Sequence, residues 1–470
     1  MTRRQFLNTT IAVAGSVKTT GTPGMRADLT ELSLTELLSR LRTRALSPAE
    51  AAGAYLERIG RLDDELHAYI TIAADSARSR AQDLAARDPR GSLLFGAPIA
   101  HKDLFETAGI RTTGGSRLFE RYVPGRDATL VARLAAAGAI TLGKTNTHEL
   151  GGGVTTINPF FGTTRNPRDP SRIAGGSSGG SAAAVVARLA VAATGTDTGG
   201  CVRIPAALCG CVGFKPTFGV LSTAGILGAA PTFDHAGFLT RTVEDLVPLL
   251  AAGSGVDPRD PASVPLAASG DVAAVPIRGL RIGVARRFFF DDLDAQVGAA
   301  MENALSRLAR AGATVRDVQV PLDGTTMARV FDPIVDAEIR QTYDRDWRER
   351  PEMFSGSFAE LFKAPIPSGL ELAAAHRERR AFQVDITERF DQVDVLVMPT
   401  VPVVAPRIDG PIDGALILRN TWPFNAAHLP ALTLPCGSAD ALPVGLQLAG
   451  PPFGDRSLIA IGTSIERALS

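Results

Sequence analysis

Two glycine-rich stretches that flank one apolar run constrain the fold of this chain more than any other feature. Residues 175–219 read GGSSGGSAAAVVARLAVAATGTDTGGCVRIPAALCGCVGFKPTFG. We expect a loop over residues 175–181, an apolar helix over 182–193 and a second loop over 195–201. Glycine lets main-chain N–H groups crowd around one point without a side-chain clash. The pattern therefore predicts a preorganised main-chain pocket for an anion, either a phosphate or the oxyanion of an acyl-transfer intermediate.

Acyl transfer fits these loops better than phosphate binding does. The sequence has no Gly-x-x-x-x-Gly-Lys-Ser/Thr motif, and no Gly-x-Gly-x-x-Gly follows a strand-like run. The loops themselves hold candidate nucleophiles, which are Ser177, Ser178, Ser181 and Cys201. Upstream, the segment GAPIAHKDLF carries Lys102. Because desolvation lowers the pKa of a buried lysine, a serine or cysteine with this lysine is a workable pair of nucleophile and base.

The same segments resemble the amidase signature family, and the resemblance extends over most of the chain. Besides GGSSGGSAAA, GTDTGG and GAPIAHKD, it includes GKTNTHEL at 143–150, GTTRNPRDPSRIAGG at 162–176, PTFDHAGFLTRTVEDL at 231–246, and TWPFNAAHLPALTLPCG with LPVGLQLAGPPFGD within 421–455. In that family a lysine, a serine that follows a cis peptide bond and a nucleophilic serine form the catalytic triad. By motif position, the resemblance implies Lys102, Ser177 and residue 201 for these roles.

Residue 201 departs from the family pattern. The family has Gly-Thr-Asp-Thr-Gly-Gly-Ser where this chain has Gly-Thr-Asp-Thr-Gly-Gly-Cys. The separation between Ser177 and Cys201 is that of the family, so the change is a replacement and the register is kept. We therefore expect a thiol nucleophile, placed at a helix N-terminus and beside a lysine, which favours the thiolate.

The resemblance also implies roles for the residues around the nucleophile. Main-chain N–H groups would hold the oxyanion, with Ser178 and Asp197 as supporting hydrogen-bonding groups and Arg203 as a structural anchor. The N–H donors would belong to Thr198, Gly199, Gly200 and Cys201. The resemblance implies no metal site and no organic cofactor.

The function implied by the resemblance is that of an amidase, which converts a carboxylic amide and water to a carboxylate and ammonia or an amine. The acyl-enzyme would form on Cys201, with Ser177 and Lys102 moving the proton. Because this intermediate would be a thioester, which amines attack readily, acyl transfer or amide synthesis is a second hypothesis. A catalytically impaired relative or an A-type amidotransferase subunit is a third. Retention of Lys102 and Ser177 argues against an inactive site, and the thiol argues against the subunit.

Other chemically active residues have weaker claims to the site. Lys144 in GKTN is an alternative to Lys102, but the resemblance assigns catalysis to Lys102. His235 could form a dyad with Cys201, yet its segment TFDHAG matches a part of the family outside the triad. The three remaining cysteines are expected to be small buried residues, and they are Cys209, Cys211 and Cys436.

Alternating helix and strand patterns predict the α/β fold class. Apolar residues recur at helical spacing over residues 28–87, where Ser33 and Ser47-Pro48 are typical helix starts. Residues 280–321 read as strand, helix and strand, and residues 324–390 read as mainly helical.

A length of 470 residues would allow two or three average domains, but the resemblance implies a single large one. We expect a central twisted mixed β-sheet covered by helices on both faces. The domain would span residues 28–470, with a helical layer at 28–87 that could form a homodimer surface, the catalytic core at 96–220 and a helical substrate-pocket region at 324–390.

Charge and hydropathy exclude several classes of partner. Lys and Arg number 49, as do Asp and Glu, so the formal net charge of 0 gives no electrostatic footprint for nucleic acid or an anionic membrane. The longest apolar run, residues 182–194, is too short to span a membrane and contains Arg188. The expected partner is a small-molecule amide. Residues 1–27, beginning MTRRQFL, resemble a twin-arginine export signal, and a disordered N-terminus of a cytoplasmic enzyme is equally compatible.

Overall fold

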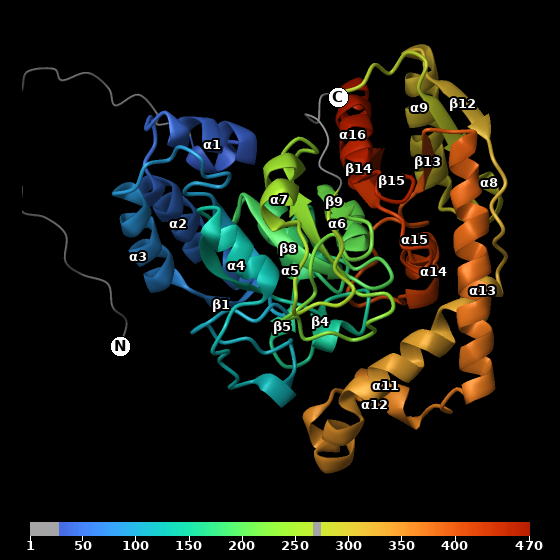
Figure 1. Ribbon diagram of the computed structural model, residues 1–470, viewed down its shortest axis with the longest axis horizontal. Coiled ribbons are helices and arrows are strands. Elements are labelled where there is room, and N and C mark those ends of the chain that lie inside the picture. The colour runs from blue at the N-terminus through green and yellow to red at the C-terminus, as the bar shows by residue number, and fades with distance from the viewer. Residues whose placement is uncertain (1–27, 267–273) are drawn as a thin grey trace, which may run out of the picture.

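One large β-sheet organises the molecule (Figure 1). The computed structural model describes residues 28–266 and 274–470, so the export signal or disordered terminus expected at 1–27 lies outside the described residues. The sheet strands are β1 (Tyr69–Ile72), β2 (Pro98–Lys102), β3 (Ile140–Thr145), β8 (Ala192–Asp197), β9 (Val212–Lys215), β10 (His235–Thr240), β11 (Arg281–Val284), β12 (Thr314–Asp317), β13 (Val395–Pro399), β14 (Ala431–Ala439) and β15 (Leu442–Ala449). Their spatial order is β1-β3-β2-β8-β10-β9-β14-β15-β13-β11-β12.

The sheet is mixed, as predicted. The neighbours β3, β2 and β8 run parallel, as do β13, β11 and β12. Every neighbouring pair from β8 to β13 through β10, β9, β14 and β15 is antiparallel, and so is the pair β1 and β3. Two short hairpins lie outside this sheet, β4 (Ile157–Asn158) with β5 (Gly162–Thr163) and β6 (Arg165–Asn166) with β7 (Asp169–Ile173). The predicted α/β class with one central sheet is confirmed.

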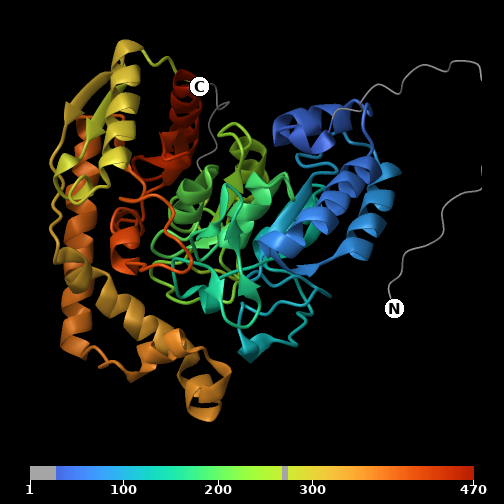
Figure 2. The same cartoon turned by 180° about the vertical axis from the view of Figure 1, so that it is seen from behind.

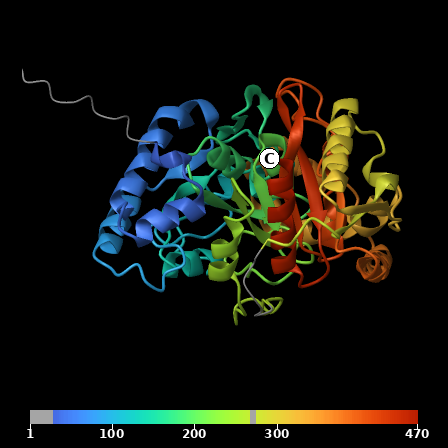
Figure 3. The same ribbon diagram turned by 90° about the horizontal axis from the view of Figure 1, so that it is seen from above.

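Helices cover both faces of the sheet, and the residues of β15 show why. Successive strand residues point to opposite faces. Gln447 accepts a hydrogen bond from Arg203 of α6 (Arg203–Cys209), whereas Leu448 lies near Gly462 of α16 (Asp455–Leu469). Neighbouring residues of β15 therefore contact helices on opposite faces of the sheet, the polar Gln447 on the side of α6 and the apolar Leu448 on the side of α16. Seen from above, the first helices lie at one end of the molecule, α9 lies at the other end, and α16 lies between them (Figure 3).

The N-terminal helical layer forms from local sequence signals. It consists of α1 (Leu34–Arg42), α2 (Pro48–Leu66) and α3 (Ala74–Ala85). Ser33 and Ser47 each begin a helix, as the sequence predicts. Each also forms a capping box with a glutamate three residues later, which was expected for Ser33 alone. The apolar face of α1 is fully or almost fully buried. The other helices of the main body are α4 (Thr129–Ala136), α5 (Gly179–Val186), α7 (Leu246–Gly253), α8 (Arg286–Phe289), α9 (Ala295–Arg310), α14 (Gly414–Leu418) and α15 (Trp422–Ala426).

The segment after Ser181 differs from the prediction. A helix was expected over residues 182–193, but α5 ends at Val186 and Arg188 takes a left-handed conformation with φ of 60°. The chain then enters β8, which lies between β2 and β10 and is buried at every position. A strand buried on both faces has the same continuous apolar pattern as a buried helix, which explains the error. The second loop therefore starts at Thr198, and Gly195 belongs to the strand.

Residues 324–390 form a helical arm beside the sheet (Figure 2). The arm consists of α10 (Thr326–Val330), α11 (Asp332–Glu349), α12 (Gly356–Lys363) and α13 (Gly369–Thr387). Aromatic rings hold its helices together, with Phe354 stacked on Phe358 at 5.6 Å and Trp347 stacked on Phe362 at 4.9 Å between centroids. Phe331 connects the arm to the body, since its ring lies 5.7 Å from that of Trp422. Single 3₁₀ turns occur at Leu29–Glu31, Arg117–Phe119, Glu149–Gly151, Pro351–Met353 and Glu388–Asp391.

Candidate active site

Lys102 ends β2 at the centre of the predicted site. Its side chain is fully buried, and its Nζ donates hydrogen bonds to Ser177 Oγ and to Thr196 Oγ1, each at 2.7 Å. Burial lowers the pKa of Lys102 to about 8, although the nearby Cys201 and Asp197 favour the charged form. A lysine with this pKa is half neutral near pH 8 and can accept a proton there.

The loop before α5 presents Ser177 to this lysine. The Gly176–Ser177 peptide bond is cis, as the resemblance implies. The carbonyl oxygen of Ser177 accepts a hydrogen bond from the His148 N–H at 3.1 Å. Thr156 Oγ1 donates to Gly175 O at 2.8 Å and to Ser177 O at 3.2 Å. The main chain on both sides of Ser177 is therefore held in place.

Cys201 lies in the loop between β8 and α6, and the main chain brings it to the same place. Its carbonyl oxygen accepts a hydrogen bond from the Ser178 N–H at 3.2 Å, and Ser178 Oγ donates to Thr196 O at 3.2 Å. Ser178 thus joins the two predicted loops. Over the described ranges, 28–266 and 274–470, no hydrogen bond links the Cys201 thiol to Ser177 Oγ. The thiol instead borders a cavity that opens next to the loop.

The main chain from Thr198 to Cys201 has N–H groups that a ligand could use. The N–H groups of Gly199, Gly200 and Cys201 donate to no acceptor among the residues that the structure describes. Gly200 has φ of 147°, and a Cβ there would overlap Thr421 Oγ1, so only glycine fits.

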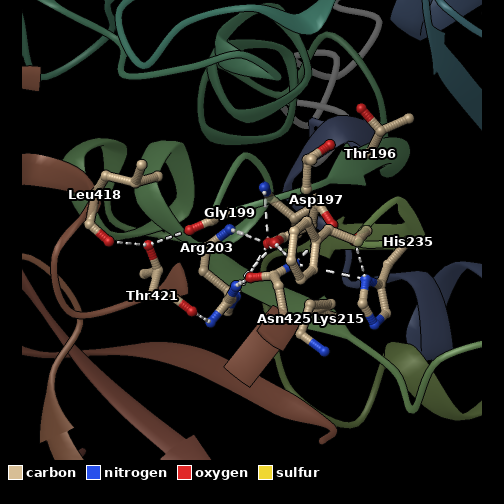
Figure 4. Close-up of polar contacts among 12 residues, drawn as sticks. Thr196, Asp197, Gly199, Arg203, Lys215, His235, Leu418, Thr421 and Asn425 are labelled. Atoms are coloured by element: carbon tan, nitrogen blue, oxygen red, sulfur yellow. Dashed lines mark hydrogen bonds and ion pairs between the residues drawn. The ribbon is translucent and has the colours of Figure 1, made fainter. Parts of the chain in front are cut away.

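Carbonyl groups of this loop are held on one side by two side chains (Figure 4). Thr421 Oγ1 donates to Gly199 O at 2.6 Å, and Asn425 Nδ2 donates to Asp197 O at 2.8 Å. In a trans peptide the C=O and the following N–H point in opposite directions. The N–H groups of Thr198 and Gly200 therefore point away from Asn425 and Thr421.

A buried ion pair supports the loop from behind (Figure 4). Arg203 donates from Nη2 to Asp197 Oδ1 at 2.8 Å and from Nε to Oδ2 at 3.0 Å, and neither side chain is exposed. Its other hydrogen bonds reach Thr421 O at 2.9 Å, Gln447 Oε1 at 2.7 Å and Asn425 Oδ1 at 2.6 Å. Burial by itself would raise the pKa of Asp197, but the Arg203 guanidinium outweighs it and lowers the pKa below its usual range.

Two cavities meet at the loop. One, of about 240 Å³, is bordered by Cys201, Gly199 and side chains of the helical arm. The other, of about 160 Å³, lies on the side of Thr196 and is bordered by Asp234 and His235. Both walls include Gly151, Thr198 and Ala229. A substrate could therefore extend to both sides of the thiol.

Lys144 is fully buried outside the site. Its Nζ donates to Phe105 O and to Thr112 Oγ1, each at 2.6 Å, and pairs with Asp103 Oδ1 at 3.3 Å. Burial lowers the pKa of Lys144 to about 8 as well, so the two lysines cannot be told apart by pKa. Geometry separates them, because only Lys102 contacts Ser177.

His235 and the other cysteines also stay apart from the proton path. His235 Nδ1 lies 2.6 Å from Phe233 O, and within the described part of the chain no hydrogen bond joins His235 to Cys201. All four cysteines are buried and free of disulfides. The described residues contain no group of three or more His, Cys, Asp or Glu side chains that could hold a metal ion, and no helix among them is long and apolar enough to cross a membrane.

Sequence reasoning missed several residues that shape the site. Thr196 is a hydrogen-bond partner of Lys102 and lies inside the GTDTGG motif. Thr196 and Asp197 are successive residues of β8 and point to opposite faces of the sheet, which was the available signal. Thr421 and Asn425 lie in the segment TWPFNAAH, which belongs to the resemblance but carried no assigned role.

Comparisons with known proteins agree with the fold and the motifs. Residues 50–459 match the family model Amidase. The A subunit of glutamyl-tRNA(Gln) amidotransferase from Geobacter sp. (strain M21) is 37% identical over 474 residues, covering 94% of this chain and 98% of that protein. A structure of the same subunit from Thermotoga maritima is 33% identical, with a TM-score of 0.81 over 94% of this chain and 96% of that one.

A third similar chain comes from a vestigial protein complex that reveals the evolutionary origins of an s-triazine catabolic enzyme. It is 32% identical, with a TM-score of 0.85, and the match covers 93% of this chain and 98% of that one. The sheet, its helices and the glycine-rich loops thus define an α/β protein of the amidase fold. This chain belongs to the amidase signature family.

Proposed function

We propose that this protein hydrolyses a carboxylic amide C–N bond through a thioester on Cys201. The observation that carries the proposal is the buried Lys102 Nζ, 2.7 Å from Ser177 Oγ, with its pKa lowered to about 8 by burial. A base whose pKa is near the working pH transfers protons efficiently. Membership of the amidase signature family supports the same reaction.

In the first step, the Cys201 sulfur attacks the carbonyl carbon of the amide. The thiol proton passes to Ser177 Oγ while the Ser177 hydroxyl proton passes to neutral Lys102 Nζ. The carbonyl π electrons move to the oxygen, which the free N–H groups of the loop would bind. Each such donor is worth about 3–4 kcal/mol of transition-state stabilisation.

In the second step, the C–N bond breaks and the electron pair stays on nitrogen. Lys102 returns its proton through Ser177 to this nitrogen, which leaves as ammonia or an amine. Water then attacks the thioester carbon, and its proton travels to Lys102 by the same path. The C–S bond breaks, Lys102 returns its proton through Ser177 to the sulfur, and the carboxylic acid leaves and gives its own proton to solvent.

Ammonia release from a panel of primary amides tests this proposal. We expect release by the wild type and by a Lys363→Ala control, because Lys363 is an exposed lysine on α12 whose side chain is 60% accessible. Release should fall to background in Lys102→Ala, with folding checked by circular dichroism. Absence of release from every amide, or release that does not depend on Lys102, would refute the mechanism.

The relatives support a second candidate function, in which the chain is the A subunit of an amidotransferase. The supporting observation is 37% identity to a protein of that name along 98% of its length. In this role the chain would perform the same amide cleavage as one part of a complex. Glutamine-dependent amidation of glutamyl-tRNA by the chain reconstituted with subunits from a relative tests it, and no product above the level without the chain would refute it.

A further inference from the structure

We propose that the amides this enzyme cleaves carry an apolar, uncharged acyl group, and that amides with a charged acyl chain, free glutamine included, are poor substrates. The inference rests on the proposed function, because it assigns the cavity beside Cys201 to the acyl group. It also separates the two candidate functions.

Among the residues that the structure describes, none that lines this cavity has a charged side chain. The apolar part of the wall comes mostly from the helical arm and includes Phe331, Val335, Ile339, Phe358, Leu361 and Leu418. Its side-chain hydroxyls belong to Thr198 and Ser357. A carboxylate or ammonium placed here would lose its hydration without gaining an ionic partner, which is strongly unfavourable.

Phe331 lies directly against the second glycine-rich loop, and Phe358 lies against Gly152 in a separate loop. A Cβ on Gly199 would be 2.9 Å from Phe331 Cζ, and a Cβ on Gly152 would be 2.7 Å from Phe358 Cε2. Neither loop could carry a side chain at these points without displacing a ring. The arm therefore forms one wall of the cavity next to the thiol.

Glu149 fixes the helix that carries Phe358. Its Oε2 accepts a hydrogen bond from the Ser355 N–H at 3.0 Å, and its Oε1 accepts one from Ser116 Oγ at 2.7 Å. Ser355 caps α12 through a hydrogen bond from the Phe358 N–H at 3.3 Å. The Glu149 carboxylate thus holds the apolar wall, and each of its two oxygens already accepts a hydrogen bond.

The second cavity does not supply a cation that could pair with a substrate carboxylate. Asp234 is the one carboxylate among the described residues that line this cavity, and that side chain already accepts from Thr198 Oγ1 at 2.6 Å, Ala229 N at 2.8 Å and Ala230 N at 3.0 Å. No lysine or arginine occurs among the residues of 28–266 and 274–470 that line either cavity. The carboxylate of an amino-acid amide would find no cation on either side.

The cavity is large enough for a short acyl group. Its volume of about 240 Å³ leaves room for a chain of several carbon atoms. A six-carbon chain or a short phenylalkyl group fits this space.

The test compares four primary amides. Hexanamide is the apolar substrate, adipic acid monoamide and 6-aminohexanamide place a carboxylate or an ammonium at the end of a similar chain, and L-glutamine is the amino-acid amide. We expect kcat/KM for hexanamide to exceed that for each charged amide by at least about a hundredfold, as burial of an unpaired charge requires. A difference below about threefold for any of them would overturn the inference.

Two variants of α11 test the wall itself. Val335→Arg places a cation on the wall, and Ala337→Arg adds the same charge to the same helix outside the wall. We expect Val335→Arg to raise the kcat/KM of adipic acid monoamide relative to hexanamide at least tenfold, and Ala337→Arg to leave the ratio unchanged. Equal ratios in both variants would contradict the assignment of this wall to the acyl chain.

A binding measurement separates this inference from the proposed function. Titration calorimetry of Cys201→Ala with hexanamide and with adipic acid monoamide reads out affinity without turnover. Tighter binding of hexanamide supports the apolar acyl pocket, and equal or tighter binding of the charged amide refutes it. Failure of the wild type to cleave any amide would refute hydrolysis alone, because the affinities still decide which acyl group the cavity accepts.

Discussion

Replacing Arg203 by methionine would leave the carboxylate of Asp197 buried without its cation. Arg203 makes five side-chain hydrogen bonds, two of them to Asp197, and neither member of the pair is exposed. Removal of one partner of a buried ion pair costs about 3–5 kcal/mol, because the remaining charge stays desolvated. We expect the free energy of unfolding of Arg203→Met to fall by this amount, and ammonia release to be lost as the loop behind Cys201 loosens.

Urea titration followed by circular dichroism measures the change in stability, and Arg281→Met is the matched control. Arg281 pairs with Asp394 at 2.7 Å, but the two side chains are 47% and 34% exposed, so its loss should cost less than about 1 kcal/mol. The double variant Arg203→Met with Asp197→Asn should recover part of the lost stability, since the uncompensated charge is gone. The reasoning is refuted if Arg203→Met costs no more than Arg281→Met, or if the double variant is less stable than Arg203→Met alone.

Three further predictions concern the base, the loop and the arm. Because burial lowers the pKa of Lys102 to about 8 and the neutral amine is the base, kcat/KM should rise with pH and level off above about pH 8; a decline across that range would mean that protonated Lys102 is required. Gly200→Ala should lower kcat at least about a hundredfold and the free energy of unfolding by about 1–3 kcal/mol, because its Cβ would overlap Thr421. The control Gly53→Ala on α2, where a Cβ meets open space, should leave kcat unchanged. Wild-type kinetics in Gly200→Ala would argue against the oxyanion loop. Glu149→Gln weakens the connection to Ser355 and should raise KM for hexanamide several-fold while changing kcat less than KM, and an unchanged KM in steady-state assays would show that the arm does not depend on this contact.

Local sequence patterns predicted the features that depend on few neighbouring residues. The helix starts at Ser33 and Ser47-Pro48 depend on a few adjacent residues, and both occur in the structure. The contact between Lys102 and Ser177 spans 75 residues, yet the motifs that carry both residues were specific enough to predict it.

Features that depend on distant packing were beyond prediction. Arg203 was expected to be an anchor, but its partners Thr421 and Gln447 lie 218 and 244 residues away, and no local pattern connects them. The continuous apolar pattern of residues 182–193 could not show that the chain turns at Arg188 and enters the sheet. The cavity wall likewise arises only when the arm folds onto the loop at Gly199.

The most direct measurement of the central claim is the mass of the enzyme during turnover. Acid quenching of the reaction with hexanamide, followed by intact-mass spectrometry and peptide mapping, should show one hexanoyl group on the peptide that contains Cys201. Neutral hydroxylamine should remove the group, and Cys201→Ala should not acquire it. Ammonia release with a hexanoyl group on Ser177, or continued ammonia release by Cys201→Ala, would contradict catalysis by the thiol.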